Sequence, residues 1–130
     1  MKSGKIWGIT ELVHANHSFE FHRIEIKKGG MCSKHKHKHK WNGFFVESGS
    51  LLIRIWKETD SIEAGISTHI DETILTGGEF TMVKPTEYHQ FECLEDTIAF
   101  ELYWAEFSHD DIVRENHGEI NSNHLLMEQC

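Results

Sequence analysis

The stretch that decides the fold is residues 33–49, which read SKHKHKHKWNGFFVESG. Histidine and lysine alternate through its first half, and a period of two is the pattern of a β-strand, so the histidines share one face. The second half is apolar and aromatic. It ends at Ser-Gly-Ser in residues 48–50 and is followed by the apolar residues 51–56. Two such runs around a short glycine turn predict a tight hairpin.

Similar short runs of β-branched and aromatic residues continue on both sides of this stretch. We expect a strand over residues 19–26, with a bulge where the alternation changes phase at His22 and Arg23. The polar residues 57–65 predict a surface loop. Further strands are expected over residues 67–76, 79–84 and 98–107. Many strands without helices between them predict an all-β fold, which can be a sandwich, a jelly roll or a barrel.

The length of 130 residues suits one hydrophobic core and therefore one domain. We divide the chain into a barrel domain over residues 1–107 and a C-terminal tail over residues 108–130. The tail is polar apart from Leu125, Leu126 and Met127. It is expected to form either a short helix packed on the barrel or a partly disordered segment.

The charge and the apolar pattern exclude some partners. The formal net charge is -8, and an acidic surface repels phosphate backbones, so we expect no nucleic-acid partner. Apolar residues never run for the roughly 20 positions that a membrane-spanning helix needs, so we expect no membrane partner. Three cysteines and the lack of an apolar signal segment predict a reducing, cytoplasmic location.

The histidine tract is the candidate for chemistry. Same-face imidazoles on one strand converge on a point, and neutral imidazole is a common ligand of zinc, iron, nickel, copper and manganese. The alternative is an exposed polar strand that collects metal adventitiously. The histidines outside the tract and away from residue 89 have no ligand spacing, and we expect them at the surface: His14, His17, His22, His69, His109, His117 and His124.

The spacing around the tract resembles the two motifs of the cupin family. The first motif contains two glycines, two histidines and a glutamate, and its places are taken here by Gly29, His35, His37, Asn42 and Gly49. The second motif matches at Gly78, Pro85 and His89, with the proline displaced by one residue and Thr86 in the place of a glycine. The resemblance implies a single-domain cupin jelly-roll β-barrel.

The cupin resemblance also implies one divalent metal ion, which can be Zn, Fe, Mn or Ni. Its ligands are expected to be His35, His37, Asn42 and His89. Asn42 stands where the motif has a glutamate, and an amide oxygen can coordinate but brings no charge, so the site would be more positive and weaker. His39, on the same face as the other histidines, is a candidate to compensate.

Most of residues 5–118 also resemble the cupin domain of type II mannose-6-phosphate isomerases. The similarity is carried by Trp7-Gly8, by residues 22–26 and 37–49, and by DDIVR at residues 110–114. It implies a sugar or sugar phosphate as substrate, with a metal that polarises a carbonyl and a base that moves a proton between adjacent carbons. The candidates for catalysis are Lys40, as a phosphate contact, and Glu101, as the base; Glu87 is a further acidic candidate beside His89.

Three functions remain open at this stage. The first is the sugar isomerase, and the second is an iron-dependent dioxygenase, because a three-histidine ferrous site can bind oxygen. The third is a non-catalytic module that binds a small ligand. Cupins commonly pair through their sheets, so the resemblance implies a homodimer. The aromatic residues expected in the barrel core are Trp41, Phe44, Phe80, Phe91, Phe100, Tyr103 and Trp104.

Overall fold

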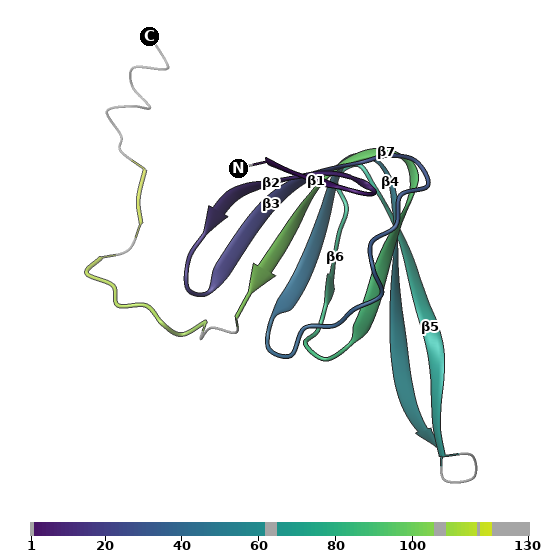
Figure 1. Cartoon of the computed structure of the whole chain (residues 1–130). Coiled ribbons are helices and arrows are strands. Elements are labelled where there is room, and N and C mark those ends of the chain that lie inside the picture. Colours follow the sequence, from purple (N-terminus) through teal and green to yellow (C-terminus); the bar gives the residue numbers. More distant parts are fainter. Residues whose placement is uncertain (1, 62–64, 106–108, 117, 121–130) are drawn as a thin grey trace.

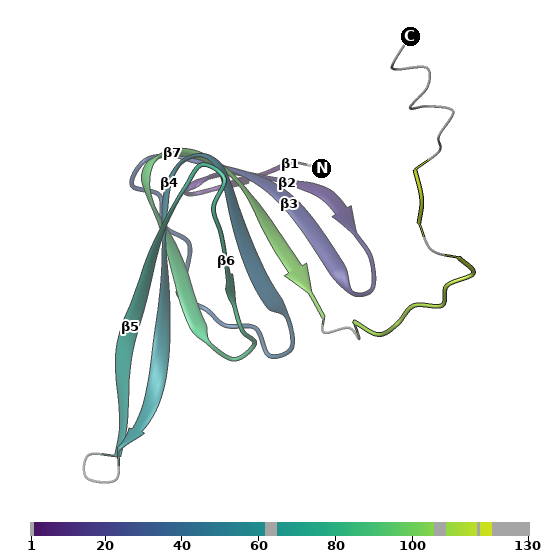
Figure 2. The ribbon, with the colours of Figure 1, turned by 180° about the vertical axis from the view of Figure 1, so that it is seen from behind.

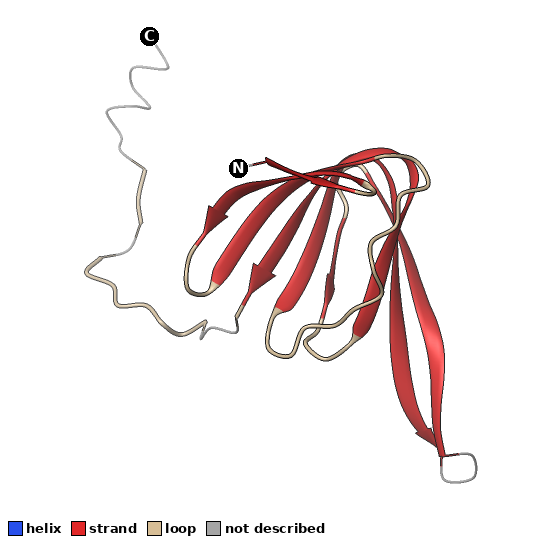
Figure 3. Cartoon of the chain, viewed as in Figure 1, coloured by secondary structure: helices blue, strands red, loops and turns tan. Residues whose placement is uncertain are grey.

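The computed structural model describes residues 2–61, 65–105, 109–116 and 118–120, with the backbone alone for residues 59–61 and 65–68. The described residues form strands joined by turns and loops, without a helix, so the predicted all-β class is confirmed (Figure 3). The strands are β1 (Lys2–Lys5), β2 (Gly8–Ala15), β3 (Phe19–Ile26), β4 (Trp41–Ser61), β5 (Gly65–Thr76), β6 (Phe80–Val83) and β7 (Tyr88–Trp104).

The two longest strands, β4 and β7, pair antiparallel and curve together (Figure 1). The register of their ladder shifts between Val46 and Leu51. Gly49 has φ +103°, and a Cβ there would collide with the carbonyl oxygen of Asp96 and the hydroxyl of Thr97. Only glycine fits this close approach of the two backbones. The tight hairpin expected around residues 48–50 is wrong, because β4 runs through Gly49 as one strand and both of its parts pair with β7. The irregular part of the ladder instead divides the sheet into two halves.

The first half of the sheet holds β1, β2, β3, the end of β7, the start of β4, and β6 beyond it. The second half holds β5, the end of β4 and the start of β7. Next to β7 in this half runs an irregular segment, residues 29–37, which exchanges backbone hydrogen bonds with residues 89–93. Figure 2 shows the same arrangement from behind.

The core lies between the two halves and joins their inward-facing side chains. Trp7, from the loop before β2, packs edge-on against Phe91 of β7 with ring centroids 5.1 Å apart. Phe44 of β4 meets the same Phe91 ring at 6.2 Å. The fully buried members of the core include Ile24, Phe44, Val46, Leu51, Ile53, Val83, Phe91, Cys93 and Ala99.

The bulge expected in residues 19–26 is not in β3. The ladder of β3 with β7 runs from Phe19 to Ile26 without a shift, and the irregularity lies in β2, between Leu12 and His14. The change of phase has another cause, because this strand is apolar on both faces. Ile24 is fully buried in the core, whereas Phe21 packs on the outer side of the sheet against Phe100.

The surface loop expected over residues 57–65 is also wrong. The ladder of β4 with β5 continues from Ser50 to Ser61, so most of these residues belong to a long hairpin. In Figure 1 this hairpin projects beyond the rest of the barrel. A projecting two-stranded ribbon meets water on both faces, so its strands do not need alternating apolar residues. The polar composition of these residues was therefore wrongly interpreted as a loop.

The aromatic residues expected in the core do not all lie there. Phe44 and Phe91 are buried in the core, as predicted. The others are not core residues: Tyr103 lines an inner cavity, and Trp41 stacks on Trp104 at 6.2 Å. An outer apolar face is formed by Phe21, Phe45, Phe80, Phe100 and Leu102, which line a hollow of about 420 Å³; Phe80 is 49% exposed.

The chain after β7 carries neither helix nor strand in residues 109–116 and 118–120. The apolar residues Leu125, Leu126 and Met127, on which a helical tail was predicted, lie outside the described residues. Within the part of the chain that the structure describes, no helix is long and apolar enough to cross a membrane.

Candidate metal centre and its cavity

His35 and His89 are held side by side by the backbone. The amide of His35 donates to the carbonyl of His89 at 3.1 Å, and the amide of His89 donates to the carbonyl of His35 at 2.8 Å. Directly paired residues of antiparallel strands carry their side chains on the same face. The two imidazole rings accordingly lie 4.6 Å apart between centroids.

His37 joins the pair from two residues further along the same segment. Its carbonyl accepts a hydrogen bond from the amide of Thr86 at 2.7 Å, which ties this segment to the turn before β7. Its ring lies 5.1 Å from His35 and 5.4 Å from His89 between centroids. One ligand atom from each of the three histidines falls within 4.8 Å of the others, so the three could hold one metal ion.

The turn that delivers His89 has an unusual backbone. Thr86, which occupies the place of a motif glycine, has φ +73°. A β-branched residue rarely adopts this left-handed conformation, whereas glycine does so freely. The turn therefore keeps the shape that a glycine would give it, and the hydrogen bond from Thr86 to His37 helps to hold that shape.

The protonated nitrogen of two rings is fixed by backbone carbonyls. His35 Nδ1 lies 2.8 Å from the carbonyl oxygen of Ser33, and His89 Nδ1 lies 3.0 Å from that of Glu87. A carbonyl only accepts, so each Nδ1 must carry the proton. The lone pair of each neutral imidazole is then on Nε2, which is the atom free to bind a metal.

Asn42 presents its oxygen to the same point. It lies at the start of β4 and is fully buried. Its Nδ2 donates to the carbonyl of Leu102 at 3.2 Å and to the carboxylate of Glu101 at 3.4 Å. Its Oδ1 then faces Nε2 of His89 at 3.0 Å. Both of these facing atoms carry lone pairs and neither carries a proton.

This donor set fits a divalent cation. Nε2 of His37 is a third candidate ligand atom: it is buried and has no hydrogen-bond partner among the described residues. Three imidazole nitrogens and one amide oxygen therefore converge as acceptors. A cation shared between them satisfies all four, and nitrogen with oxygen is the donor set of zinc, iron, nickel and manganese sites. It departs from the motif described above in that Asn42 replaces the glutamate, so no protein ligand is an anion.

The histidines are kept neutral by their surroundings. Burial, followed by the neighbouring His35 and His89, lowers the pKa of His37 from 6.5 to about 4. Burial also lowers the pKa of His89. A neutral imidazole is the form that binds a metal, so the site is prepared for a cation over a wide pH range.

A cavity of about 350 Å³ opens beside the histidines, with His35 in its wall. Glu101 of β7 also lines the cavity, and burial raises the pKa of its carboxyl group. The hydroxyl of Tyr103 is hydrogen-bonded to this carboxyl group. The remaining wall residues are Lys5, Trp7, Thr10, His22, Cys32, Ser33 and Phe91. The site thus combines ligand atoms with a chamber for a small molecule.

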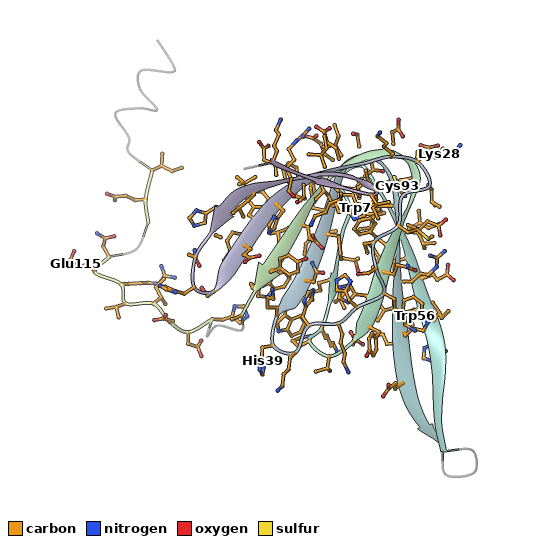
Figure 4. The ribbon with its side chains drawn as sticks, viewed as in Figure 1. Trp7, Lys28, His39, Trp56, Cys93 and Glu115 are labelled. Atoms are coloured by element: carbon orange, nitrogen blue, oxygen red, sulfur yellow. The ribbon has the colours of Figure 1, made fainter. Side chains whose placement is uncertain are left out.

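Other residues singled out in the sequence lie away from this cavity. Lys40 is exposed, with Nζ 4.7 Å above the ring of Tyr103, and lines a separate hollow of about 100 Å³. The carboxylate of Glu87 pairs with Lys57 at 2.6 Å. His39 is exposed at the rim of the barrel (Figure 4) and is not part of the group of three histidines.

His22 and Cys32 are among the cavity residues that were not recognised from the sequence. His22 was expected at the surface, but it faces inward, lies 3.2 Å from Glu20 and packs edge-on against Tyr103. Its place after the phase change in residues 19–26 was the available signal. Cys32 also lines the cavity; it is not one of the three residues grouped around the candidate metal centre, and burial raises the pKa of its thiol to about 11.

No protein-family profile and no curated protein sequence matches the chain. Solved structures do. KdgF from Halomonas sp. has a TM-score of 0.64 at 13% identity, covering 82% of this chain and 89% of that chain. An RmlC-like cupin from Shewanella frigidimarina has a TM-score of 0.59 at 20% identity, over 85% and 86% of the two chains.

A cupin superfamily protein from Desulfitobacterium hafniense is also similar, with a TM-score of 0.60 at 8% identity, over 82% of this chain and 84% of that chain. These similarities are in shape, since the identities are at most 20%. They confirm the jelly-roll barrel that the resemblance to the cupin motifs implied. The chain therefore has the cupin fold.

Proposed function

We propose that the chain is a metal-dependent cupin that acts on a small oxygenated metabolite, with a sugar or sugar phosphate as the substrate class. One observation carries the proposal: four acceptor atoms, from His35, His37, His89 and Asn42, converge beside a polar cavity. Cavities at the small end of the range for ligand sites suit compact polar molecules.

The lining of the cavity supports a hydroxylated substrate. Thr10 and Ser33 offer hydroxyl groups, and Lys5 offers an ammonium group. The rings of Trp7 and Phe91 form an apolar wall, on which the carbon face of a sugar ring could lie. Such a mixture of a few polar groups and an aromatic surface is typical of a binding site for a small polar molecule.

The proposed chemistry is isomerisation of a sugar. A divalent metal, when bound, supplies a Lewis acid for a carbonyl oxygen. Glu101 is the proposed proton-transfer group, because its carboxyl lines the cavity and burial raises its pKa, as is common for catalytic acids and bases. Lys40 lies across Tyr103 in the neighbouring hollow, so we propose it as a phosphate contact for a substrate long enough to reach past that ring.

The experiment combines metal analysis with activity assays on tag-free protein. Elemental analysis is expected to find one equivalent of a transition metal in the wild type and none in a His35→Ala, His89→Ala double variant. The loaded protein is then assayed for interconversion of aldoses and ketoses, with and without phosphate. Oxygen consumption instead of isomerisation would favour the dioxygenase. Ligand-induced melting shifts without turnover would favour the non-catalytic binding module.

We also propose that the chain forms a homodimer through the outer apolar face, in a reducing, cytoplasmic setting. The five residues that define this face bear no charge, and an apolar surface of several strands is usually covered in a stable protein.

Cys32 and Cys93 are free thiols rather than a disulfide, which agrees with a reducing setting. Comparison of a cytoplasmic with a secreted preparation for disulfide content tests the location.

A further inference from the structure

We infer that Glu101 is a positioning residue that decides which atom of Asn42 faces the three histidines. The inference rests on the metal site of the proposed function but assigns to Glu101 a role separate from proton transfer. It concerns the orientation of one buried amide, whose oxygen can bind a metal and whose NH2 group cannot.

The two orientations of the Asn42 amide can be compared by their hydrogen bonds. In the observed orientation, Nδ2 donates to the carbonyl of Leu102 at 3.2 Å and to the carboxylate of Glu101 at 3.4 Å. Reversal loses both bonds and gains one, from Nδ2 to Nε2 of His89, since those sites are 3.0 Å apart. Without Glu101, the observed orientation would keep only the bond to the carbonyl of Leu102, and reversal would exchange that bond for the one to His89.

Glu101 therefore stabilises the observed orientation, because without it the two orientations make equal numbers of hydrogen bonds. Its carboxylate accepts from the NH2 group in the observed orientation and would face the amide oxygen in the reversed one. Because the hydroxyl of Tyr103 and the NH2 group of Asn42 both donate to this carboxyl group, it acts towards Asn42 as an acceptor, and two facing acceptors repel. The residue is well placed to act in this way, because its carboxyl is held by Tyr103 and its backbone pairs with Phe44 and His22.

The consequence for the site is a choice between four ligands and three. With Glu101 in place, the oxygen of Asn42 joins the imidazoles of His35, His37 and His89. Without it, the amide can turn its NH2 group to His89, which satisfies that ring and withdraws the fourth ligand. Groups that orient metal ligands in this way typically change metal affinity by about 10- to 100-fold.

The test is a double-mutant cycle on metal binding, with Co²⁺ as the probe. Glu101→Met removes the acceptor at similar size, Asn42→Ala removes the amide, and the double variant combines them. The dissociation constant for Co²⁺ and the visible absorption spectrum of the bound ion are measured for each. Glu92→Met is the matched control, since Glu92 is a half-buried acid of the same strand that pairs with Arg54 instead.

We expect Glu101→Met to weaken Co²⁺ binding by about 10-fold or more and to give the spectrum of Asn42→Ala. In the Asn42→Ala background, the same substitution is expected to cost less than about threefold. A loss of equal size in both backgrounds overturns the inference, because Glu101 would then act on the metal by its charge and not through Asn42. An unchanged affinity and spectrum in Glu101→Met also overturns it.

If Glu101→Met does not fold, Glu101→Gln replaces it in the cycle. Glutamine can still offer an acceptor oxygen, so we expect the wild-type spectrum and an affinity within about threefold of the wild type. A larger loss that persists in the Asn42→Ala background contradicts the inference. Failure of the wild type itself to bind Co²⁺ is a different result, which contradicts the metal site of the proposed function.

Discussion

The amide oxygen of Asn42 lies 3.0 Å from Nε2 of His89, although the two residues are far apart in the ladder of β4 and β7. Asn42 pairs with Tyr103 at one end of this ladder, and His89 pairs with Ile55 at the other. The bend at Gly49 brings the two ends together. The candidate metal centre therefore lies between the two halves of the sheet, and each half contributes ligand atoms.

The first prediction concerns the ligands themselves. His89→Ala is expected to weaken binding of a divalent metal by at least about 100-fold, because it removes one of three imidazoles. His39→Ala is the control and is expected to bind as the wild type does, since His39 is exposed and lies outside the cluster. Isothermal titration of the metal-free proteins with Zn²⁺ provides the measurement. Equal losses in the two variants would show adventitious binding to the whole tract.

The second prediction concerns the pH dependence of the metal-free protein. The folded-state pKa of His37 is about 4, below the usual 6.5, and that of His89 is also lowered. Between these values the unfolded chain binds more protons than the folded one, so the free energy of unfolding is expected to fall as the pH decreases from about 6.5 towards 4.

Urea unfolding near pH 7 and near pH 5, with a chelator present, measures this dependence. His37→Gln is expected to reduce the difference between the two pH values, because glutamine does not titrate. His39→Gln serves as the control and should leave the difference unchanged. A metal-free wild type that is equally stable at both pH values would contradict the assignment of His37 as a neutral, buried ring.

The third prediction concerns the strained turn before β7. Thr86→Gly is expected to stabilise the protein by up to about 1 kcal/mol, because it relieves the positive φ while adding some entropy to the unfolded chain. Thermal unfolding of the metal-free protein gives the value. Destabilisation by this substitution would show that the side chain of Thr86 contributes more than its backbone conformation costs.

The fourth prediction concerns the thiol in the cavity. Burial raises the pKa of Cys32 from 9.0 to about 11, which lowers the thiolate fraction near pH 8 by about 100-fold. Alkylation of Cys32 by iodoacetamide is therefore expected to be at least about 100-fold slower than that of glutathione. Peptide mapping of the alkylated protein follows the reaction. A rate as fast as that of glutathione would contradict the burial of this thiol.

The fifth prediction tests the proposed dimer. Phe100→Glu places a charge at the centre of the outer apolar face and is expected to convert a dimer into a monomer, because an unpaired charge is costly in an apolar interface. Ile74→Glu, at an exposed position of β5, is the control. Light scattering after size-exclusion chromatography measures the mass. A monomeric wild type would exclude a stable homodimer.

The three histidines could be predicted because they stand at the histidine places of the cupin motifs that the sequence resembles. The strand expected from the alternation of histidine and lysine is wrong: residues 36–40 lie outside any strand, and His35 makes only an isolated bridge with His89. The orientation of Asn42 could not be predicted, because it depends on Glu101 and on the carbonyl of Leu102, which lie 59 and 60 residues away in the chain.

Part of the fold escaped prediction for a related reason. The phase change near His22 was interpreted as a bulge because alternation was expected to mark one apolar face and one polar face. In the structure, Ile24 fills the core while Phe21 covers the outside, so both faces are apolar. The same assumption placed His22 at the surface. A single sequence does not reveal that a sheet has a second face to cover.

The bend at Gly49 affects which substitutions the candidate metal centre can tolerate. A side chain at this position would collide with the backbone of Asp96 and with Thr97. This steric clash would lie where the two half-sheets meet. A screen of random variants for loss of metal binding is therefore expected to find substitutions of Gly49, although this residue is not one of the candidate ligands. The geometry of the candidate metal centre thus depends on a bend between strands, which a list of ligands alone would omit.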